Sequence, residues 1–359
     1  MARRTRTKPE RTIPSVTEDG ILDLLHTSLD EELAYKRRRV EKALAARGLD
    51  AVVPPPEPSP RRRGARARVN LRVSREGRLV VHRKGSHEEA PPPLEAMARP
   101  EIVTVAEAIE AQLTTHPSLA RGVERVELRS DGERVVTVLY GAVPKPARAR
   151  LAELLAPALG ADGALCLQGR ALVGQPRSTL DVGTLQLEVG PLTFFQVNLE
   201  VNRALVASVC RAVTQLEPTR VLDLFGGAGN LSLPVSKAAG CPVELVESHP
   251  SAVKDARANV ARLGLPVTVA QEDAYALQAG SRFFDVAVLD PPRRGAGPAM
   301  AAVCATRPKA VVLVSCHPPS LARDVQQAMA HGYELASVEL HDLFPLTSHV
   351  ESLAVLTRR

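Results

Sequence analysis

From about residue 191 onward, the chain repeats one pattern, in which a short run of apolar residues is followed by a stretch with helical periodicity. The apolar runs are Val221–Leu224, Val243–Val246, Val267–Val269, Val286–Leu289 and Val311–Val314, and the helical stretches are 198–216, 229–239, 250–263, 297–306 and 318–331. Runs that are apolar throughout are typical of parallel strands buried on both faces. The pattern therefore predicts a doubly wound α/β sheet, which binds ligands at the carboxyl ends of its strands.

The N-terminal half is organised differently. Residues 1–20 are predicted to be a flexible basic tail, and residues 21–64 a helical segment followed by a linker rich in Pro and Arg. Residues 65–190 mix strand, hairpin and helix patterns, including a Ser130-Asp131-Gly132-Glu133 turn between two strand-like runs. We therefore expect a smaller α+β domain over 65–190, and the doubly wound sheet over 191–359.

Positive charge is concentrated near the N-terminus. Residues 1–70 contain 16 Lys and Arg against 10 Asp and Glu, whereas the remainder of the chain contains 30 of each. Such an excess is typical of proteins with a phosphate-bearing partner, although a solvated basic tail gives the same composition. No apolar run approaches the length of a membrane span, and no apolar segment follows the basic N-terminus, so we expect a cytoplasmic protein.

One of the five cysteines stands out by its position. The five are scattered without a Cys-x-x-Cys pair, which predicts neither a disulfide framework nor a metal site. A lone cysteine is usually a small core residue. Cys316, however, follows a predicted strand and directly precedes a predicted helix, whose N-terminus would lower the pKa of its thiol. Cys316 is therefore a candidate nucleophile.

Two other motifs end predicted strands at the same edge of the sheet. The first is Phe225-Gly226-Gly227-Ala228-Gly229-Asn230, whose glycines permit a sharp turn and a close approach to a ligand. Its spacing departs from the dinucleotide pattern and suits a positively charged cofactor without phosphate. Glu247 ends the next strand, where a carboxylate can accept both hydroxyls of a ribose. The second motif, Asp290-Pro291-Pro292-Arg293, ends the fourth strand.

Together these motifs resemble those of the bacterial RNA 5-methyluridine (uracil-C5) methyltransferases, which act on transfer RNA or large-subunit ribosomal RNA. The resemblance covers roughly 191–359, including Phe194–Asn198 and Asp342–Glu351, and continues more weakly upstream through Tyr35–Arg39. It implies a Rossmann-like class I methyltransferase sheet preceded by the smaller α+β domain. It also implies that S-adenosylmethionine is the methyl donor.

The resemblance assigns a role to each candidate residue. Cys316 would be the nucleophile that adds to the uracil ring, and Glu351 the base that removes the proton from carbon 5. The residues that would line the donor site are Gln196, Phe225, Asn230, Glu247, Asp273 and Asp290. The partner would be RNA, not DNA or a membrane, and we expect ribosomal RNA because the Tyr-Lys-Arg stretch looks more like those members. We also expect a monomer.

The sequence departs from the family pattern in three places. Some members carry an iron–sulfur cluster on cysteines upstream of the Tyr-Lys stretch, but Gly20–Leu33 contains no cysteine, so we expect neither a cluster nor another metal. Many members begin with a small β-barrel RNA-binding domain, for which we see no room before the first predicted helix. His317 stands where the family usually has Asn, which affects local hydrogen bonding but not the nucleophile.

Three alternatives stay open at this point. Transfer RNA could be the substrate in place of ribosomal RNA. An RNA cytosine-C5 methyltransferase would share the thiolate chemistry but usually has a second cysteine after the Asp-Pro motif, where this chain has Arg293. A non-catalytic RNA-binding or ribosome assembly factor would suit the basic segment, although such a protein would not need both Cys316 and Glu351. Arg293 also argues against methylation of an amino group, because those enzymes place an aromatic residue there.

Overall fold

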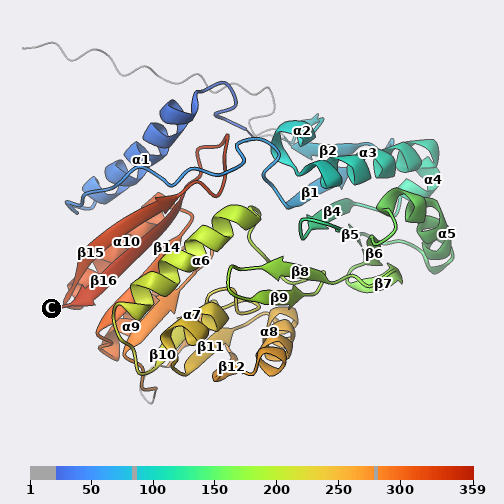
Figure 1. The fold of residues 1–359 in the computed structure, drawn as a ribbon. Coiled ribbons are helices and arrows are strands. Elements are labelled where there is room, and N and C mark those ends of the chain that lie inside the picture. The colour runs from blue at the N-terminus through green and yellow to red at the C-terminus, as the bar shows by residue number, and fades with distance from the viewer. Residues whose placement is uncertain (1–21, 83–86, 279–281) are drawn as a thin grey trace, which may run out of the picture.

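The computed structural model describes residues 22–82, 87–278 and 282–359, and it contains two large sheets that lie side by side (Figure 1). The flexible tail predicted over 1–20 lies outside the described residues. Within these ranges, no helix is both long and apolar enough to cross a membrane.

The C-terminal sheet has the strand order β12-β11-β10-β13-β14-β16-β15. Its strands are β10 (Val221–Leu224), β11 (Val243–Glu247), β12 (Val267–Gln271), β13 (Val286–Leu289), β14 (Ala310–Ser315), β15 (Tyr333–His341) and β16 (Glu351–Arg358). Strands β10 to β14 pair in parallel, as the apolar runs predict. The strand order reverses between β10 and β13, which is where such sheets bind ligands. The predicted doubly wound fold is confirmed.

Helices cover both faces of this sheet because successive residues of each buried strand point to opposite sides. Val221 and Val288 pack on one face against α6 (Leu199–Thr214), α7 (Ser232–Ala239) and α8 (Pro250–Leu263). Leu222 and Leu289 pack on the other face against α9 (Pro298–Ala305) and α10 (Pro318–Ala330). The helix predicted within 21–64 is α1 (Leu29–Ala45), and its Val40 joins this second core. Thus α1 belongs to the C-terminal sheet by its packing.

The hairpin formed by β15 and β16 was not predicted from the sequence. Strand β16 lies between β14 and β15 and runs antiparallel to both. Strand β15 mixes charged and apolar residues, so no continuous apolar run marks it. The hairpin matters for the site because Glu351 is the first residue of β16.

The central unit is built on a second sheet, with the order β3-β2-β1-β4-β5-β6-β7. Its strands are β1 (Arg68–Val73), β2 (Leu79–His82), β3 (Glu89–Ala90), β4 (Arg125–Ser130), β5 (Val135–Tyr140), β6 (Ala164–Leu167) and β7 (Arg170–Val173). The predicted hairpin around Asp131-Gly132 is confirmed as β4–β5. The helical elements here are α2 (Leu94–Met97), α3 (Pro100–Thr115), α4 (Pro117–Ala120), α5 (Lys145–Leu155) and the 3₁₀ turn η1 (Ala156–Leu159), which share one core with the sheet.

A buried arginine joins the central sheet to the segment that leads into the C-terminal unit. Arg129 on β4 donates to the carbonyl oxygens of Pro191 at 2.6 Å and Thr193 at 2.5 Å, and its guanidinium lies 4.8 Å from the centre of the Phe195 ring. A two-stranded ribbon, β8 (Ser178–Asp181) and β9 (Gln186–Val189), precedes this segment. Because Leu187 of the ribbon packs in a core of the C-terminal sheet, a domain boundary near residue 190 stays a prediction.

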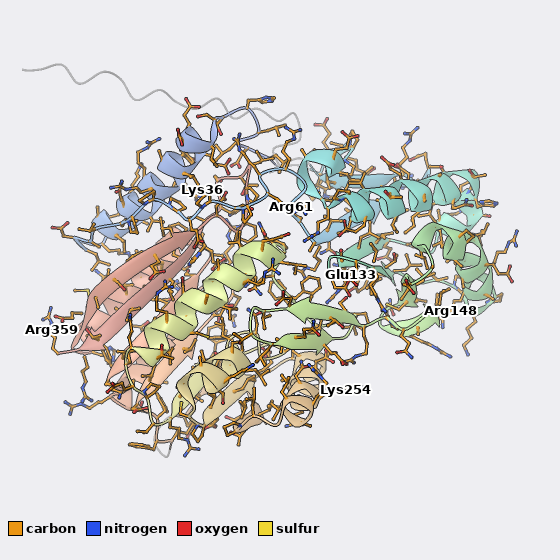
Figure 2. All side chains as sticks on the ribbon, viewed as in Figure 1. Lys36, Arg61, Glu133, Arg148, Lys254 and Arg359 are labelled. Carbon is orange, nitrogen blue, oxygen red and sulfur yellow. The ribbon has the colours of Figure 1, made fainter. Side chains whose placement is uncertain are left out.

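A buried cluster of charges fastens α1 to the segment between β15 and β16. The ammonium group of Lys36 (labelled in Figure 2) contacts Glu32 at 2.7 Å, the carboxylate of Asp342, and the carbonyl oxygen of Phe344 at 3.0 Å. The side chains of Lys36, Glu32 and Asp342 are fully buried. Glu32 also accepts the backbone N–H of Leu346 at 2.7 Å. Because every charge has a partner, the cluster holds the segment that leads to Glu351 in one conformation.

We predict that Lys36→Met destabilises the protein by about 3–5 kcal/mol, because it leaves two buried carboxylates without their shared cation. The matched control is Arg37→Met on the same helix. The Arg37 side chain is 44% exposed and pairs with Glu41, so its loss should cost less than about 1 kcal/mol. Urea denaturation of both variants measures the two free energies of unfolding, and equal losses would contradict the prediction.

Candidate active site

A cavity of about 910 Å³ opens at the carboxyl ends of the parallel strands. It brings together all but one of the predicted site residues, namely Gln196, Phe225, Glu247, Asp273, Asp290, Cys316 and Glu351. The exception, Asn230, forms a reciprocal amide pair with Asn202 on α6, at 2.9 and 3.0 Å. Asn230 lines a smaller adjoining pocket, which it shares with Gln196, Phe225 and Asp290.

The glycine turn after β10 holds Glu247 beside the cavity. The carboxylate of Glu247 accepts the backbone N–H of Gly227 at 3.0 Å and that of His249 at 2.7 Å. Gly227 faces open space, since a Cβ added there would meet nothing within 4 Å. Gly229 has no such room, because its Cβ would collide with Leu233, and its φ of +96° also favours glycine. The turn is therefore packed tightly against Leu233 at Gly229 and open at Gly227.

The opposite wall of this region is aromatic and acidic. Asp273 caps the 3₁₀ turn η2 (Ala274–Ala276) by accepting the N–H of Tyr275 at 2.9 Å. The rings of Tyr275 and Phe225 lie 5.1 Å apart, tilted by 59°. Phe225 and Tyr275 thus provide flat apolar surfaces, and Asp273 and Glu247 provide carboxylates beside them. Tyr275 was not among the predicted site residues, and only its place two residues after Asp273 could have indicated it.

Antiparallel pairing of β14 with β16 places Cys316 opposite Glu351. Ser315, the last residue of β14, pairs with Ser352 of β16. Cys316 follows the first of these residues and Glu351 precedes the second, so the thiol and the carboxyl meet at one edge of the sheet. Both side chains line the cavity together with Asp290.

Burial favours the neutral forms of three carboxyl groups in this region, those of Glu351, Asp290 and Asp223. Burial, and to a lesser degree the neighbouring Asp290, raises the pKa of Glu351 well above its usual value. Burial also raises the pKa of Asp290 to about 6, against a hydrogen bond from Gln196 Nε2 at 3.5 Å that lowers it. Asp223 at the end of β10 has its pKa raised to about 7, mainly by burial. One of its carboxylate oxygens, Oδ1, has no hydrogen-bond partner.

The environment of Cys316 corrects one prediction from the sequence. Burial, followed by the charges of Glu351 and Asp290, raises the pKa of the Cys316 thiol to about 12, whereas the helix N-terminus was expected to lower it. Helix α10 begins with Pro318 and Pro319, which have no backbone N–H, so this terminus offers fewer donors than most. Cys316 is therefore a protonated thiol near pH 7 in this state.

Three further residues line the cavity and were not assigned a role from the sequence, namely Arg68, Phe194 and Phe344. Arg68 reaches it from β1 of the central sheet, and its guanidinium lies 4.4 Å from the centre of the exposed Phe194 ring. Phe344 comes from the segment held by Lys36 and packs edge-on against His349, with 5.8 Å between ring centres. Burial lowers the pKa of His349 to about 4, so this histidine is neutral near pH 7. Nothing in the local sequence around Arg68 points to the site.

The described residues contain no group of three or more His, Cys, Asp or Glu side chains arranged to hold a metal ion. The fold and the cavity together define a class I methyltransferase. Two family models match the chain, that of the methyltransferase small domain over residues 203–307 and that of tRNA (uracil-5-)-methyltransferase over residues 276–359.

Similar proteins agree with this class. An uncharacterized RNA methyltransferase of Gloeobacter violaceus is 31% identical over 363 residues, covering 91% of this chain and 78% of the relative. The 23S rRNA (uracil(1939)-C(5))-methyltransferase RlmD of Shewanella halifaxensis is 37% identical over 198 residues, covering 54% of this chain and 44% of the relative. The match thus spans less than half the length of this RlmD relative.

Among solved structures, the tRNA (uracil-54, C5)-methyltransferase of Pyrococcus abyssi, in complex with S-adenosyl-L-homocysteine, has the same fold, with a TM-score of 0.73. It is 21% identical to this chain, and the match covers 94% of this chain and 85% of that one. The chain belongs to the same family of RNA methyltransferases as the Gloeobacter relative, and residues 276–359 match the uracil-5 methyltransferase model, as the sequence motifs indicated.

We predict that Asp290→Asn stabilises the protein at pH 8 and has little effect near pH 4. Because the native pKa of Asp290 is raised from its ordinary value of 3.8 to about 6, the wild-type protein loses folding free energy as the pH rises between these two values. At pH 8 the neutral amide should regain up to about 3 kcal/mol.

The matched control is Asp285→Asn. Backbone N–H groups of Thr219 and Arg220 and the side chain of Lys309 outweigh the effect of burial and lower the pKa of Asp285, so this substitution should destabilise at pH 8. Thermal unfolding of both variants over pH 4–8 measures the effect. If the two variants shift stability in the same direction at pH 8, the conclusion that ionised Asp290 destabilises the fold is wrong.

Proposed function

We propose that this chain transfers a methyl group from S-adenosylmethionine to carbon 5 of a uridine in RNA. The observation that carries the proposal is the pairing of β14 with β16, which sets Cys316 opposite Glu351 in the same cavity as Glu247, Asp273 and Asp290. A nucleophile and a base that face each other beside a donor site are what this reaction needs.

The residues present suit this donor. Glu247 would accept the ribose hydroxyls, Asp273 would contact the adenine, and Phe225 and Tyr275 would offer it apolar surfaces. The amide of Gly227, which in a dinucleotide site would be available to phosphate, already donates to Glu247. The surrounding carboxylates would repel a pyrophosphate and attract the positively charged sulfonium and ammonium groups of the donor. Bound there, the donor supplies an electrophilic methyl group.

The protein's own residues would then act in sequence on the uracil ring. The Cys316 thiol gives its proton to water as its sulfur adds to carbon 6, and the enolate that forms on the ring makes carbon 5 nucleophilic enough to take the methyl group. Glu351, once ionised, removes the hydrogen from carbon 5, and the C–S bond breaks to restore the ring and release Cys316. A uridine must leave its stack to reach this buried pair.

Ribosomal RNA is the substrate that we propose, because relatives named for 23S rRNA match about half of the chain. Transfer RNA is the alternative. We further propose a monomer that works in the cytoplasm on RNA, not DNA. Mapping 5-methyluridine in ribosomal and transfer RNA from a strain that lacks the gene tests the choice of substrate. A modification lost only from transfer RNA would reverse it.

We predict that Cys316→Ala lowers methyl transfer by at least about 10³-fold, because the activating sulfur is gone. Tritiated S-adenosylmethionine and RNA from the deletion strain provide the assay. Cys304→Ala is the matched control, since Cys304 is a buried thiol on α9 that packs against Met300 outside the cavity. A Cys316→Ala variant as active as wild type would refute the mechanism.

We also predict that Glu351→Gln accumulates a covalent protein–RNA complex through Cys316. Without a base, the adduct is methylated but cannot lose the hydrogen at carbon 5. RNA that contains 5-fluorouridine should trap the wild-type protein in the same way, because fluorine cannot leave carbon 5 as a proton would. Denaturing gels and mass spectrometry detect the complex. A complex with 5-fluorouridine RNA but none with Glu351→Gln would show that Glu351 is not the base, and the absence of both would contradict the covalent mechanism.

A further inference from the structure

The five residues that follow Asp290-Pro291-Pro292 form a rigid turn, Arg293–Gly297, which we call the arginine loop. Its backbone is held by side chains from α10 and η2. These bonds are Ser320 Oγ to the carbonyl oxygen of Arg293 at 2.8 Å, Arg323 Nη2 to that of Arg294 at 2.5 Å, Tyr275 Oη to that of Gly295 at 2.8 Å, and the Ala296 N–H to Asp324 Oδ2 at 2.6 Å. Gly295 has a φ of +85° and no room for a Cβ, which would collide with Arg323 and Asp324.

The two arginine side chains of this loop are exposed, and their N–H groups are available to a ligand. Across the described residues, no hydrogen bond or ion pair engages the guanidinium of Arg293 or of Arg294. Neighbouring Arg323, by contrast, pairs with Asp324 at 3.0 Å. A backbone held in place by side chains, with exposed cations that have no hydrogen bond or ion pair among the described residues, is preorganised to bind an anion.

The geometry of Arg294 leaves its hydrogen-bonding edge free. Its guanidinium lies over the Tyr275 ring, 3.8 Å from the ring centre. Stacking occupies the face of a guanidinium, whereas the N–H groups that fork around a phosphate lie in its plane. Tyr275 therefore orients Arg294 without using its donors.

The loop also stands between two cavities. Arg293 and Arg294 both line the cavity that contains Cys316. Arg294 also lines a second, more open groove of about 1040 Å³, which shares Asp273 and Tyr275 with that cavity and continues along α10 past Arg323 and Gln327. We call it the outer groove. A polymer whose target nucleotide enters the catalytic cavity thus has a path away from it across Arg294.

We propose that the arginine loop binds consecutive phosphodiesters of the RNA strand that carries the target uridine, with Arg293 contacting the phosphate at the catalytic cavity and Arg294 the one at the outer groove. The proposal rests on the proposed function, since it takes RNA as the substrate. The carboxylates Glu247 and Asp290 lie in the catalytic cavity but not in the outer groove, and they disfavour phosphate there. Among the described residues, the arginine loop offers cations without acidic partners, so a phosphate is favoured at the loop. The strand then leaves along the outer groove.

The test measures RNA binding by the full-length chain, with no turnover required. The probe is a fluorescein-labelled single-stranded RNA that contains uridine, and affinity is measured by anisotropy across a range of salt concentrations. Arg293→Ala and Arg294→Ala should each weaken binding roughly tenfold. Each should also reduce the slope of log affinity against log salt by about one. Arg294→Lys keeps the charge but not the fork, and should lie between wild type and Arg294→Ala.

Arg220→Ala is the matched control. Arg220 is an exposed arginine at the opposite edge of the sheet, just before β10, and its side chain has no partner among the described residues. It should bind RNA like wild type. Melting temperatures of all variants should match that of wild type, because these side chains are exposed.

A second measurement separates the loop from the donor site, whose ligand also carries a carboxylate. Binding of S-adenosylhomocysteine, measured by calorimetry, should be unchanged in both alanine variants. Unchanged RNA affinity and salt slope would overturn the proposal, as would a loss confined to S-adenosylhomocysteine binding. If wild type binds RNA through the loop but methylates none, the proposed reaction fails while this phosphate site stands.

Discussion

The antiparallel pairing of β16 with β14 is the contact on which the candidate site depends. In an all-parallel sheet, the residues at one edge come from strands joined by helices, and each side chain is placed independently of the others. The hairpin inserts a strand that runs the other way, so its first residue meets the last residues of β14 at the same edge. Cys316 and Glu351 are thus fixed relative to each other by backbone hydrogen bonds, not by side-chain contacts alone.

Side chains of opposite charge occupy different parts of the cavity. Carboxylates form its interior, and burial raises the pKa of two of them, Asp290 and Glu351. At its rim stand Arg293 and Arg294, which have no acidic partner among the described residues. A ligand with cationic groups is favoured inside and a polyanion outside, so one cavity can hold two reactants of opposite charge without a change of shape.

Much of the fold could be predicted from the sequence, because it rests on local patterns. Continuous apolar runs predicted β10 to β14, and the motifs at their ends predicted which side chains share the cavity. Features that depend on distant contacts could not be found in this way. Arg68 arrives from another sheet, and strand β15 has no continuous apolar run. The pKa of Cys316 was predicted in the wrong direction, because a local rule about helix ends cannot account for burial and two neighbouring carboxylates.

The buried cluster around Lys36 has a consequence for how the protein is made. Lys36 and its partner Asp342 are 306 residues apart, so almost the whole chain must emerge from the ribosome before the ammonium group finds its second carboxylate. Until then, docking α1 would bury charges that lack their full set of partners, which is unfavourable. Assembly of this helix against the rest of the molecule is therefore a late event, because a nascent chain that has not reached Asp342 leaves Lys36 without its second carboxylate.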